Sequence, residues 1–181
     1  MPSPFPVPVP ILESARLRLR GHRVEDFAVC AAMWADPEVT RHFGRTFPEE
    51  ESWARLLRYA GHWALLGFGY WFVEEKTSGR FVGEVGFADL RRDITPSLGD
   101  TPEIGWVLAA AAHGKGFATE AARAAIAWGE TNFGGRRTTC IVHPENLPSI
   151  RVAEKCGYEE VRRANYKGQP TIVFERETAC S

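Results

Sequence analysis

The sequence has few of the features that mark a specialised class of protein. Its 181 residues include only four cysteines, Cys30, Cys140, Cys156 and Cys180, and no C-x-x-C pair. A disulfide framework and a thiol-rich metal site are therefore not indicated, and we expect four reduced thiols. The five histidines never stand four residues apart, so the sequence offers no helical zinc pair and we expect no metal.

The chain also lacks an excess of charge of either sign and a long apolar run. Its 22 basic and 23 acidic side chains leave a net charge of -1, so no overall field favours a polyanion and nucleic acid is not an expected partner. No stretch approaches the ~20 uninterrupted apolar residues of a bilayer span. The proline-rich N-terminal segment has no basic region, which disfavours a signal peptide. We therefore expect a cytoplasmic protein without membrane contacts.

Length and composition predict one folded domain. Apolar residues make up 44% and charged residues 25% of the chain, the usage of ordinary soluble proteins. The boundaries we predict are a proline-rich, polyproline-like arm over 1–11, one domain over 12–177 and a short tail over 178–181.

Hydrophobic periodicity predicts a mixed α/β fold, with one sheet flanked by helices. Helices are expected over 24–36, 48–66, 118–133 and 147–155. Seven strands are expected, at 15–20, 69–75, 81–87, 102–108, 137–142, 158–163 and 171–176. The stretch 91–101 is expected to be a surface loop, because it holds proline, glycine and aspartate with little apolar content.

The most informative segment is a glycine turn between a strand and an alanine-rich helix. Gly114-Lys115-Gly116 follows the strand that ends at Leu108 and leads into the helix over 118–133. The first amides of a helix lack intrahelical acceptors and carry partial positive charge, so such a turn can hold a phosphate. Thr119 stands where a dinucleotide fingerprint needs its third glycine, and the spacing of a P-loop is absent. A plain helix start is the alternative interpretation of the turn alone.

Two motifs resemble those of the GNAT superfamily of N-acetyltransferases. HGKGFATEA at 113–121 is similar to the family's turn for the pyrophosphate of acetyl-CoA, Q/R-x-x-G-x-G/A. NLPSIRVAEKCGY at 146–158 resembles the family's second motif, N-x-x-S-x-x-V-x-E-K-x-G-F/Y. With the opening strand and the EIGW segment at 103–106, they are most similar to the branch that contains the ribosomal-protein N-terminal acetyltransferases. The resemblance covers nearly the whole chain, roughly 12–176.

The resemblance implies a seven-stranded mixed sheet in which the strands ending at Leu108 and Val142 splay apart and admit the pantetheine arm of acetyl-CoA, the cosubstrate. The sequence departs from the family at His113, where Gln or Arg is usual, and at Ala153, where many members have a tyrosine that protonates the leaving thiolate. The cofactor-binding residues that the resemblance implies are Val107, Leu108, His113, Gly114, Lys115, Gly116, Phe117, Ala118, Thr119, Asn146 and Ser149.

Acetyl transfer to a primary amine needs a base, a site for the oxyanion and an acid for the thiolate. Glu103, acting directly or through water, is the first candidate for the base, and Glu84 is the second. Backbone N–H groups near Val107 and Leu108 would hold the oxyanion. Ser149 is the nearest motif residue with a proton to give, although it could equally serve the start of its helix.

The sequence leaves the acceptor open between a protein N-terminal α-amine and a small-molecule amine. The segment 41–47 and the loop 91–101 are expected to edge the acceptor site, because loops carry such variation. The alternative function, which Ala153 favours, is a non-catalytic acyl-CoA-binding or regulatory domain. A homodimer is common in the family and is a further expectation.

Overall fold

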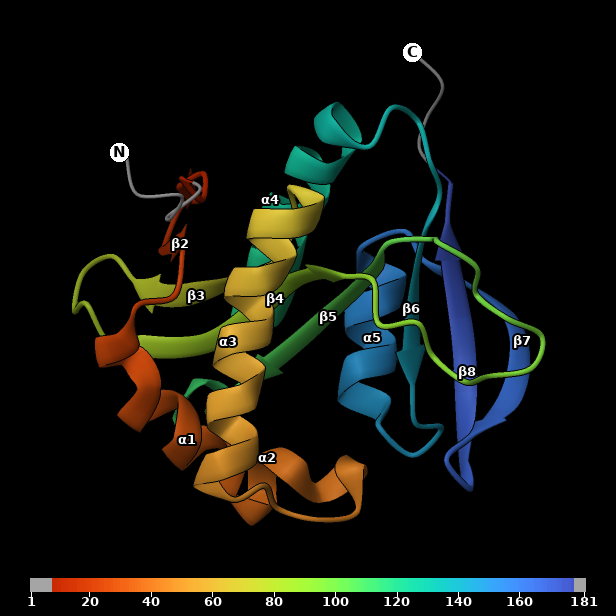
Figure 1. Ribbon diagram of the computed structural model, residues 1–181, viewed down its shortest axis with the longest axis horizontal. Helices are drawn as coiled ribbons and strands as arrows, with labels where there is room; N and C mark the ends of the chain where they lie inside the picture. Colours follow the sequence, from red (N-terminus) through yellow and green to blue (C-terminus); the bar gives the residue numbers. More distant parts are fainter. Residues whose placement is uncertain (1–7, 178–181) are drawn as a thin grey trace.

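An eight-stranded sheet runs through residues 8–177, the part of the chain that the computed structural model describes (Figure 1). Its strand order is β1-β2-β3-β4-β5-β6-β8-β7. Only β5 and β6 pair in parallel, so the sheet is mixed, as predicted. The strand beyond the seven predicted is β1, Leu12–Glu13, which at two residues is too short to give an alternating pattern.

The other strands correspond to the seven predicted ones. They are β2 (Leu17–Arg20), β3 (Tyr70–Glu75), β4 (Phe81–Ala88), β5 (Glu103–Leu108), β6 (Thr138–Val142), β7 (Glu159–Tyr166) and β8 (Gln169–Arg176). The loop predicted over 91–101 is confirmed between β4 and β5.

The main helices also follow the predictions. They are α1 (Phe27–Ala35), α3 (Glu49–Leu66), α4 (Phe117–Asn132) and α5 (Leu147–Lys155), with short 3-10 turns η1 (Val24–Asp26) and η3 (Ala110–Ala112). Three short elements were not predicted, η3, α2 (Pro37–Thr40) and η2 (Arg41–Phe43). Asp36 and Pro37 end α1 as expected, but the Asp36 side chain then accepts from the Glu38 amide, so the same two residues also begin α2.

The helices cover the two faces of the sheet unequally. Figure 1 shows α3 crossing one face and α4 lying against the other. Successive residues of β5 face opposite sides of the sheet. Trp106 faces one side, where its indole contacts Ser149 of α5. Gly105 faces the other side, where Tyr70 lies over it and stacks on Tyr59 of α3. We call the two sides the α3 face and the α4 face.

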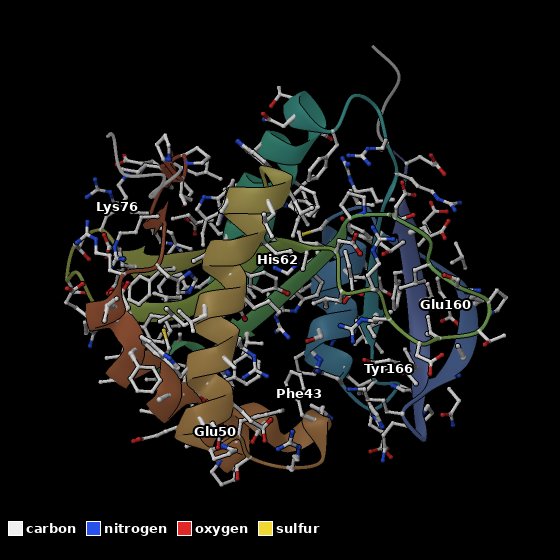
Figure 2. The ribbon with its side chains drawn as sticks, in the orientation of Figure 1. Phe43, Glu50, His62, Lys76, Glu160 and Tyr166 are labelled. Carbon is white, nitrogen blue, oxygen red and sulfur yellow. The ribbon has the colours of Figure 1, made fainter. Side chains whose placement is uncertain are left out.

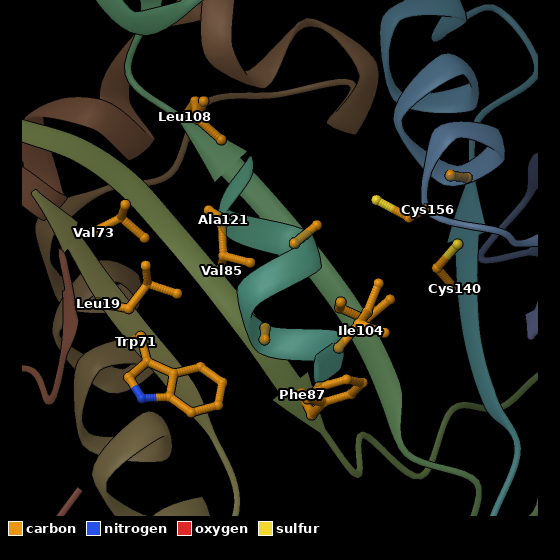
Figure 3. Close-up of a cluster of buried hydrophobic side chains, with 14 of the residues drawn as sticks. Leu19, Trp71, Val73, Val85, Phe87, Ile104, Leu108, Ala121, Cys140 and Cys156 are labelled. Atoms are coloured by element: carbon orange, nitrogen blue, oxygen red, sulfur yellow. The ribbon is translucent and has the colours of Figure 1, made fainter. Parts of the chain in front are cut away.

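The main core lies between the sheet and α4 (Figure 3). Three alanines of α4, Ala121, Ala122 and Ala125, are at most 1% exposed and let the helix approach the strands closely. Burial of each large side chain in this layer contributes about 1.5–3 kcal/mol. This packing fixes the N-terminus of α4 relative to the end of β5. The large partners on the strands are Leu19, Trp71, Val73, Val85, Phe87 and Ile104.

β5 and β6 pair at one end only. Their single register pair is Glu103 with Thr139, and the Thr139 amide donates to the Pro102 carbonyl at 3.0 Å. Toward Leu108 and Val142 the two strands diverge, as Figure 3 shows. The predicted splay is therefore present, and it lies at the end of β5 that leads into the glycine turn.

The segment before β1 lies partly within the described residues. The Trp71 indole donates to the Pro10 carbonyl at 2.8 Å, which holds this end of the predicted arm against β3. Residues 1–7 of the arm, the predicted tail and Cys180 lie outside the described residues. The other three cysteines are buried and free, as predicted. Over residues 8–177, none of the helices has both the length and the apolar character needed to cross a bilayer.

Candidate active site

The glycine turn connects the end of β5, through η3, to the first turn of α4. Gly114 and Gly116 have φ values of +73° and +78°, in the left-handed region that favours glycine. A Cβ at Gly114 would meet no heavy atom within 4 Å, so the turn is unobstructed there. Among the described residues, no side chain caps α4. Its first amides therefore have no side-chain acceptor, and the anion site that the sequence predicts at them stays a prediction.

Arg16, between β1 and β2, supports the turn together with Glu120 of α4. Arg16 donates to the Lys115 carbonyl at 3.0 Å, pairs with Glu120 at 2.7 Å and lies over the Phe117 ring at 4.5 Å. Burial opposes the charge of Glu120, but hydrogen bonds from Ser14 and Arg16 hold its pKa below the ordinary value. The sequence analysis missed this support, because the two segments are far apart in the chain.

A surface hollow of about 510 Å³ lies beside the turn. Gly116 and Thr119 line it on the α4 side, and Glu13 and Arg16 line it on the opposite side. Arg123 also lines the hollow and donates to the Lys155 carbonyl at 2.8 Å. Space therefore adjoins the free amides of α4, and the two arginines of the lining are balanced by Glu13 and Glu120.

His113 fastens the turn to the strand that precedes it. Its Nε2 donates to the Leu108 carbonyl at 2.9 Å, and its Nδ1 lies 3.8 Å from a carboxylate oxygen of Glu38 on α2. His113, predicted at the head of the cofactor turn, thus makes a positioning contact in this structure.

The hydrogen bonds of β5 to β4 and β6 show which way the backbone amides at its end point. The Ala109 amide donates to Val82 of β4, whereas the Pro102 carbonyl accepts from β6, each at 3.0 Å. Because successive residues of a strand turn their backbone groups to opposite sides, the Leu108 amide points toward the splay and the Val107 amide toward β4. Of the two amides predicted for the oxyanion, Leu108 has the required orientation.

Ser149 lies between α5 and β5, beside the splay. Asn146 caps α5, because its side chain accepts from the Ser149 amide at 3.2 Å. The Ser149 hydroxyl accepts from the Trp106 indole at 3.2 Å. An indole N–H only donates, so the hydroxyl hydrogen of Ser149 stays free to be donated elsewhere. The capping role that the sequence left open for Ser149 belongs to Asn146.

Glu84 is enclosed on the α3 face and is 1% exposed. Its carboxylate accepts from the Trp34 indole at 2.9 Å and the Tyr59 hydroxyl at 3.2 Å, and His22 Nε2 lies 3.2 Å away. Burial opposes the charge, but these contacts lower the pKa of Glu84. A carboxylate held in this way is a poor base for a substrate amine.

The same cluster contains a group of three metal-ligating residue types. Ligand atoms of His22, Cys30 and Glu84 lie within 4.8 Å of one another. The Glu84 oxygens are already bonded to Trp34 and Tyr59, and burial raises the pKa of Cys30, which keeps it a thiol. These three of the described residues therefore do not indicate a metal site.

Glu103, the first candidate for the base, lies at the paired end of β5. It is 6% exposed, and Arg92 binds both carboxylate oxygens, at 2.5 and 2.6 Å. Each oxygen keeps a further lone pair for a proton. Five residues separate Glu103 from Leu108, about 16 Å along a strand. The structure therefore brings Leu108, His113 and Ser149 together at the splay but leaves Glu103 at a distance.

Tyr70 lies between these positions, and the sequence analysis missed it. Its side chain passes over β5 so closely that a Cβ on Gly105 would collide with the tyrosine hydroxyl oxygen. Its ring stacks on Tyr59 with centroids 4.6 Å apart. Burial and the charge of Glu103 raise its pKa, so the hydroxyl keeps its proton. No motif marks this contact, because it joins β3 to a glycine two strands away.

The segment 37–43 spans the end of the splay. Glu38 approaches His113 at the end of β5, and His42 stacks on His143, the residue after β6, with ring centroids 6.0 Å apart. Burial, with the nearby charges of Arg41 and His143, lowers the pKa of His42. Figure 2 shows Phe43, the last residue of this segment, beside α3 on the side of α5. The residues at 41–43 therefore edge the splay, as expected for part of the acceptor site.

Fold and site together define an α/β domain with a glycine turn and an uncapped helix start beside a split sheet. The family model of the acetyltransferase (GNAT) domain matches residues 16–159. The chain therefore belongs to the GNAT family of acetyltransferases, and it has the fold and the enzyme class that the two motifs predicted.

Individual relatives agree with this assignment. The chain is 31% identical over 151 residues to the uncharacterized N-acetyltransferase p20 of Bacillus licheniformis, covering 82% of each chain. It is 29% identical to the solved structure of a putative GNAT-family acetyltransferase from Bordetella pertussis, with a TM-score of 0.82 over 92% of this chain and 99% of that chain. RimL, a ribosomal L7/L12 α-N-protein acetyltransferase solved in complex with coenzyme A, shares the fold, with a TM-score of 0.76 at 13% identity over 95% of this chain and 100% of that chain.

Proposed function

We propose that this protein transfers an acetyl group from acetyl-CoA directly to a primary amine. The observation that carries the proposal is the junction of an uncapped, glycine-led helix with the splay of β5 and β6. Amides from Gly114 through Thr119 would bind the pyrophosphate. Phe117 and Ala118, which the resemblance includes in the site, would contribute backbone amides, because the Phe117 side chain is buried beneath Arg16.

The pantetheine arm would extend through the splay, beside Asn146 and Ser149. RimL, which shares the fold, is described in complex with coenzyme A, and this supports the choice of cosubstrate. In this position the thioester carbonyl would lie against the end of β5. The Leu108 amide, which points into the splay, would then stabilise the oxyanion that forms when the amine attacks the carbonyl carbon.

Ser149 would act as the acid. As the carbon–sulfur bond breaks, the Ser149 hydroxyl gives its proton to the departing thiolate. The Trp106 indole, 3.2 Å from the hydroxyl oxygen, orients this proton and stabilises the alkoxide that remains until a proton returns. This arrangement replaces the tyrosine of other family members, since Ala153 is fully buried and has no proton to give.

Glu103 would act as the base through an intervening water and the Tyr70 hydroxyl. The 16 Å or so between Glu103 and Leu108 rules out direct contact with a thioester at the splay. Tyr70 lies over Gly105, between the two, on the face from which the amine must approach. Glu84, the second candidate, would serve structurally because its oxygens already accept from Trp34 and Tyr59.

A turnover assay tests the proposal. Purified protein is mixed with acetyl-CoA and a panel of N-terminal peptides and small amines, and the release of free thiol is followed. Thiol release that depends on an amine acceptor supports the enzyme. Tight acetyl-CoA binding without acceptor-dependent release would instead support the non-catalytic binding domain, which the alanine at position 153 favours.

A further inference from the structure

Arg55, on the α3 face, forms no ion pair within residues 8–177. Arg55 of α3 lies against two aromatic rings that meet edge to face, with its guanidinium carbon 3.6 Å from the Trp34 centroid and 4.6 Å from the Phe47 centroid. Its Nη1 is buried and has no hydrogen-bond partner within residues 8–177. Burial lowers the pKa of Arg55, and the opposing influence of Tyr59 and Glu84 does not compensate for it.

Two other half-buried arginines among the described residues are paired with carboxylates. Arg20 binds Asp26 at 2.7 Å, and Arg92 binds Glu103 at 2.5 Å. A buried donor without a partner destabilises a protein, more so when it is charged, and stacking on aromatic rings offsets only part of this. Two carboxylates, Glu84 and Glu51, interact electrostatically with Arg55 without forming an ion pair with it within the described residues. The Glu84 oxygens already accept from Trp34 and Tyr59, and Glu51 is paired with Arg45.

Arg55 lies on the face of the sheet from which the acceptor would approach the splay. Its neighbours Trp34 and Tyr59 both bind Glu84, and Glu84 is the register partner of Val107 on β5. Trp34 also packs edge to face on Phe43, at 5.4 Å, within the segment that spans the splay (Figure 2). The turn that would bind the cofactor phosphates leads into α4, on the opposite face of the sheet. An anion that meets Arg55 therefore arrives with the acceptor.

We propose that Arg55 binds a carboxylate carried by the amine acceptor. This inference rests on the proposed function and names the class of its substrate: a primary amine with a carboxylate a few bonds away. The aromatic rings fix the plane of the guanidinium, so its N–H groups present the planar fork that binds a carboxylate through two hydrogen bonds. A free amino acid and a protein N-terminus followed by an acidic residue share this chemistry.

Matched acceptors test the proposal. The pairs are glycine with glycinamide, and two N-terminal peptides that differ only by Glu or Gln at the second position. We expect the carboxylate member of at least one pair to have a kcat/KM about 10-fold or more higher, because hydrogen bonds to charged groups have that magnitude. The pair that shows the preference distinguishes a small amino acid from a protein N-terminus.

Variants of Arg55 identify the residue responsible. Arg55→Gln should abolish the preference, mainly through KM, with acetyl-CoA affinity unchanged, and Arg55→Lys should retain part of it. The two acceptors of a pair also differ in the basicity of their amine. Because this difference is the same for parent and variant, a change in the ratio of their kcat/KM values reports on Arg55 alone. Arg58→Gln is the matched control, because Arg58 is exposed on the same helix and should leave the preference unchanged.

Two results would overturn the inference: equal kcat/KM within every pair, or a preference that survives Arg55→Gln. If no amine is acetylated, the proposed function fails. The proposal for Arg55 is then tested by measuring the binding of ligands with and without a carboxylate. The protein loaded with coenzyme A is then titrated with N-acetylglycine and N-acetylglycinamide, and with the acetylated Glu and Gln peptides, by calorimetry. Tighter binding of a carboxylate member, lost in Arg55→Gln, would keep the anion site, and equal binding throughout would remove it.

Discussion

An aspartate at position 116 should weaken acetyl-CoA binding far more than an asparagine at the same position. Gly116 has a φ of +78°, and Asn and Asp are the side chains that best tolerate this region. A Cβ there would meet only Arg16 Nη2, at an ordinary contact distance of 3.5 Å. Both variants therefore carry a similar backbone strain, of about 1 kcal/mol, and differ in charge alone.

The magnitude follows from the position of the new charge in the phosphate turn. Two unit charges about 6 Å apart interact by about 3 kcal/mol at an effective dielectric constant of ~20. Arg16, close to the new side chain, and dissolved salt reduce this repulsion. We expect a net loss of about 2 kcal/mol for Gly116→Asp relative to Gly116→Asn, or about a 30-fold higher Kd for acetyl-CoA.

Titration calorimetry at low and high salt measures the difference, which should shrink as salt increases. Gly79→Asp and Gly79→Asn are the matched control pair, because Gly79 has a φ of +66° and open surroundings but lies in the β3–β4 turn. Their Kd values should equal that of the parent. Equal Kd values for the two Gly116 variants, with both proteins folded, would show that the phosphates do not bind at this turn.

Three further predictions concern the acid, the buried carboxylate and the base. Ser149→Ala should lower kcat about 100-fold with acetyl-CoA affinity unchanged, measured by thiol release, and an unaltered kcat would assign the proton to another group. Glu84→Gln should destabilise the fold by about 3 kcal/mol at neutral pH, measured by urea unfolding. Folding lowers the pKa of Glu84, so its ionised carboxylate stabilises the folded protein. This stabilisation is fully present above pH 4.5, the ordinary pKa, and is lost as the pH falls through the pKa of the folded state. The free energy of unfolding of the Gln variant should lack this part of the pH dependence. Glu103→Gln should lower kcat/KM more at low than at high pH, where the amine is already deprotonated, and a uniform small decrease in the pH–rate profile would give the base role to another residue.

The sequence predicted the fold and the conformation of the glycine turn well, because their signals are local. Strand alternation and helical periodicity extend over neighbouring residues, and the glycines at 114 and 116 show left-handed backbone beside a helix start. β1 was missed because two residues cannot show a period. α2 was missed because an aspartate before a proline indicates the end of one helix and the start of another equally well.

The acceptor side could not be predicted, because its contacts join distant segments. The pattern of α3 shows that Tyr59 is buried, but not that its hydroxyl donates to a glutamate 25 residues later. Arg55 has no distinguishing pattern in the sequence, since an arginine on an amphipathic helix is usually solvated. Motif matching identified Ser149 and Glu103, whereas their partners Trp106 and Arg92 required the structure.

The register of β5 divides the proposed chemistry between the two faces of the sheet. Trp106 approaches the acid, and the Leu108 amide points into the splay, whereas Gly105 and Val107 face the acceptor side. A slip of one residue would exchange the two sets, because the side chains of a strand alternate. Gly83 of β4 allows β5 to pack closely in the observed register, since a Cβ there would collide with the backbone of Val107 and Leu108; Gly86 makes the same close approach to the backbone on the β3 side. The close packing of β4 therefore determines which side of β5 faces the cofactor and which side faces the amine.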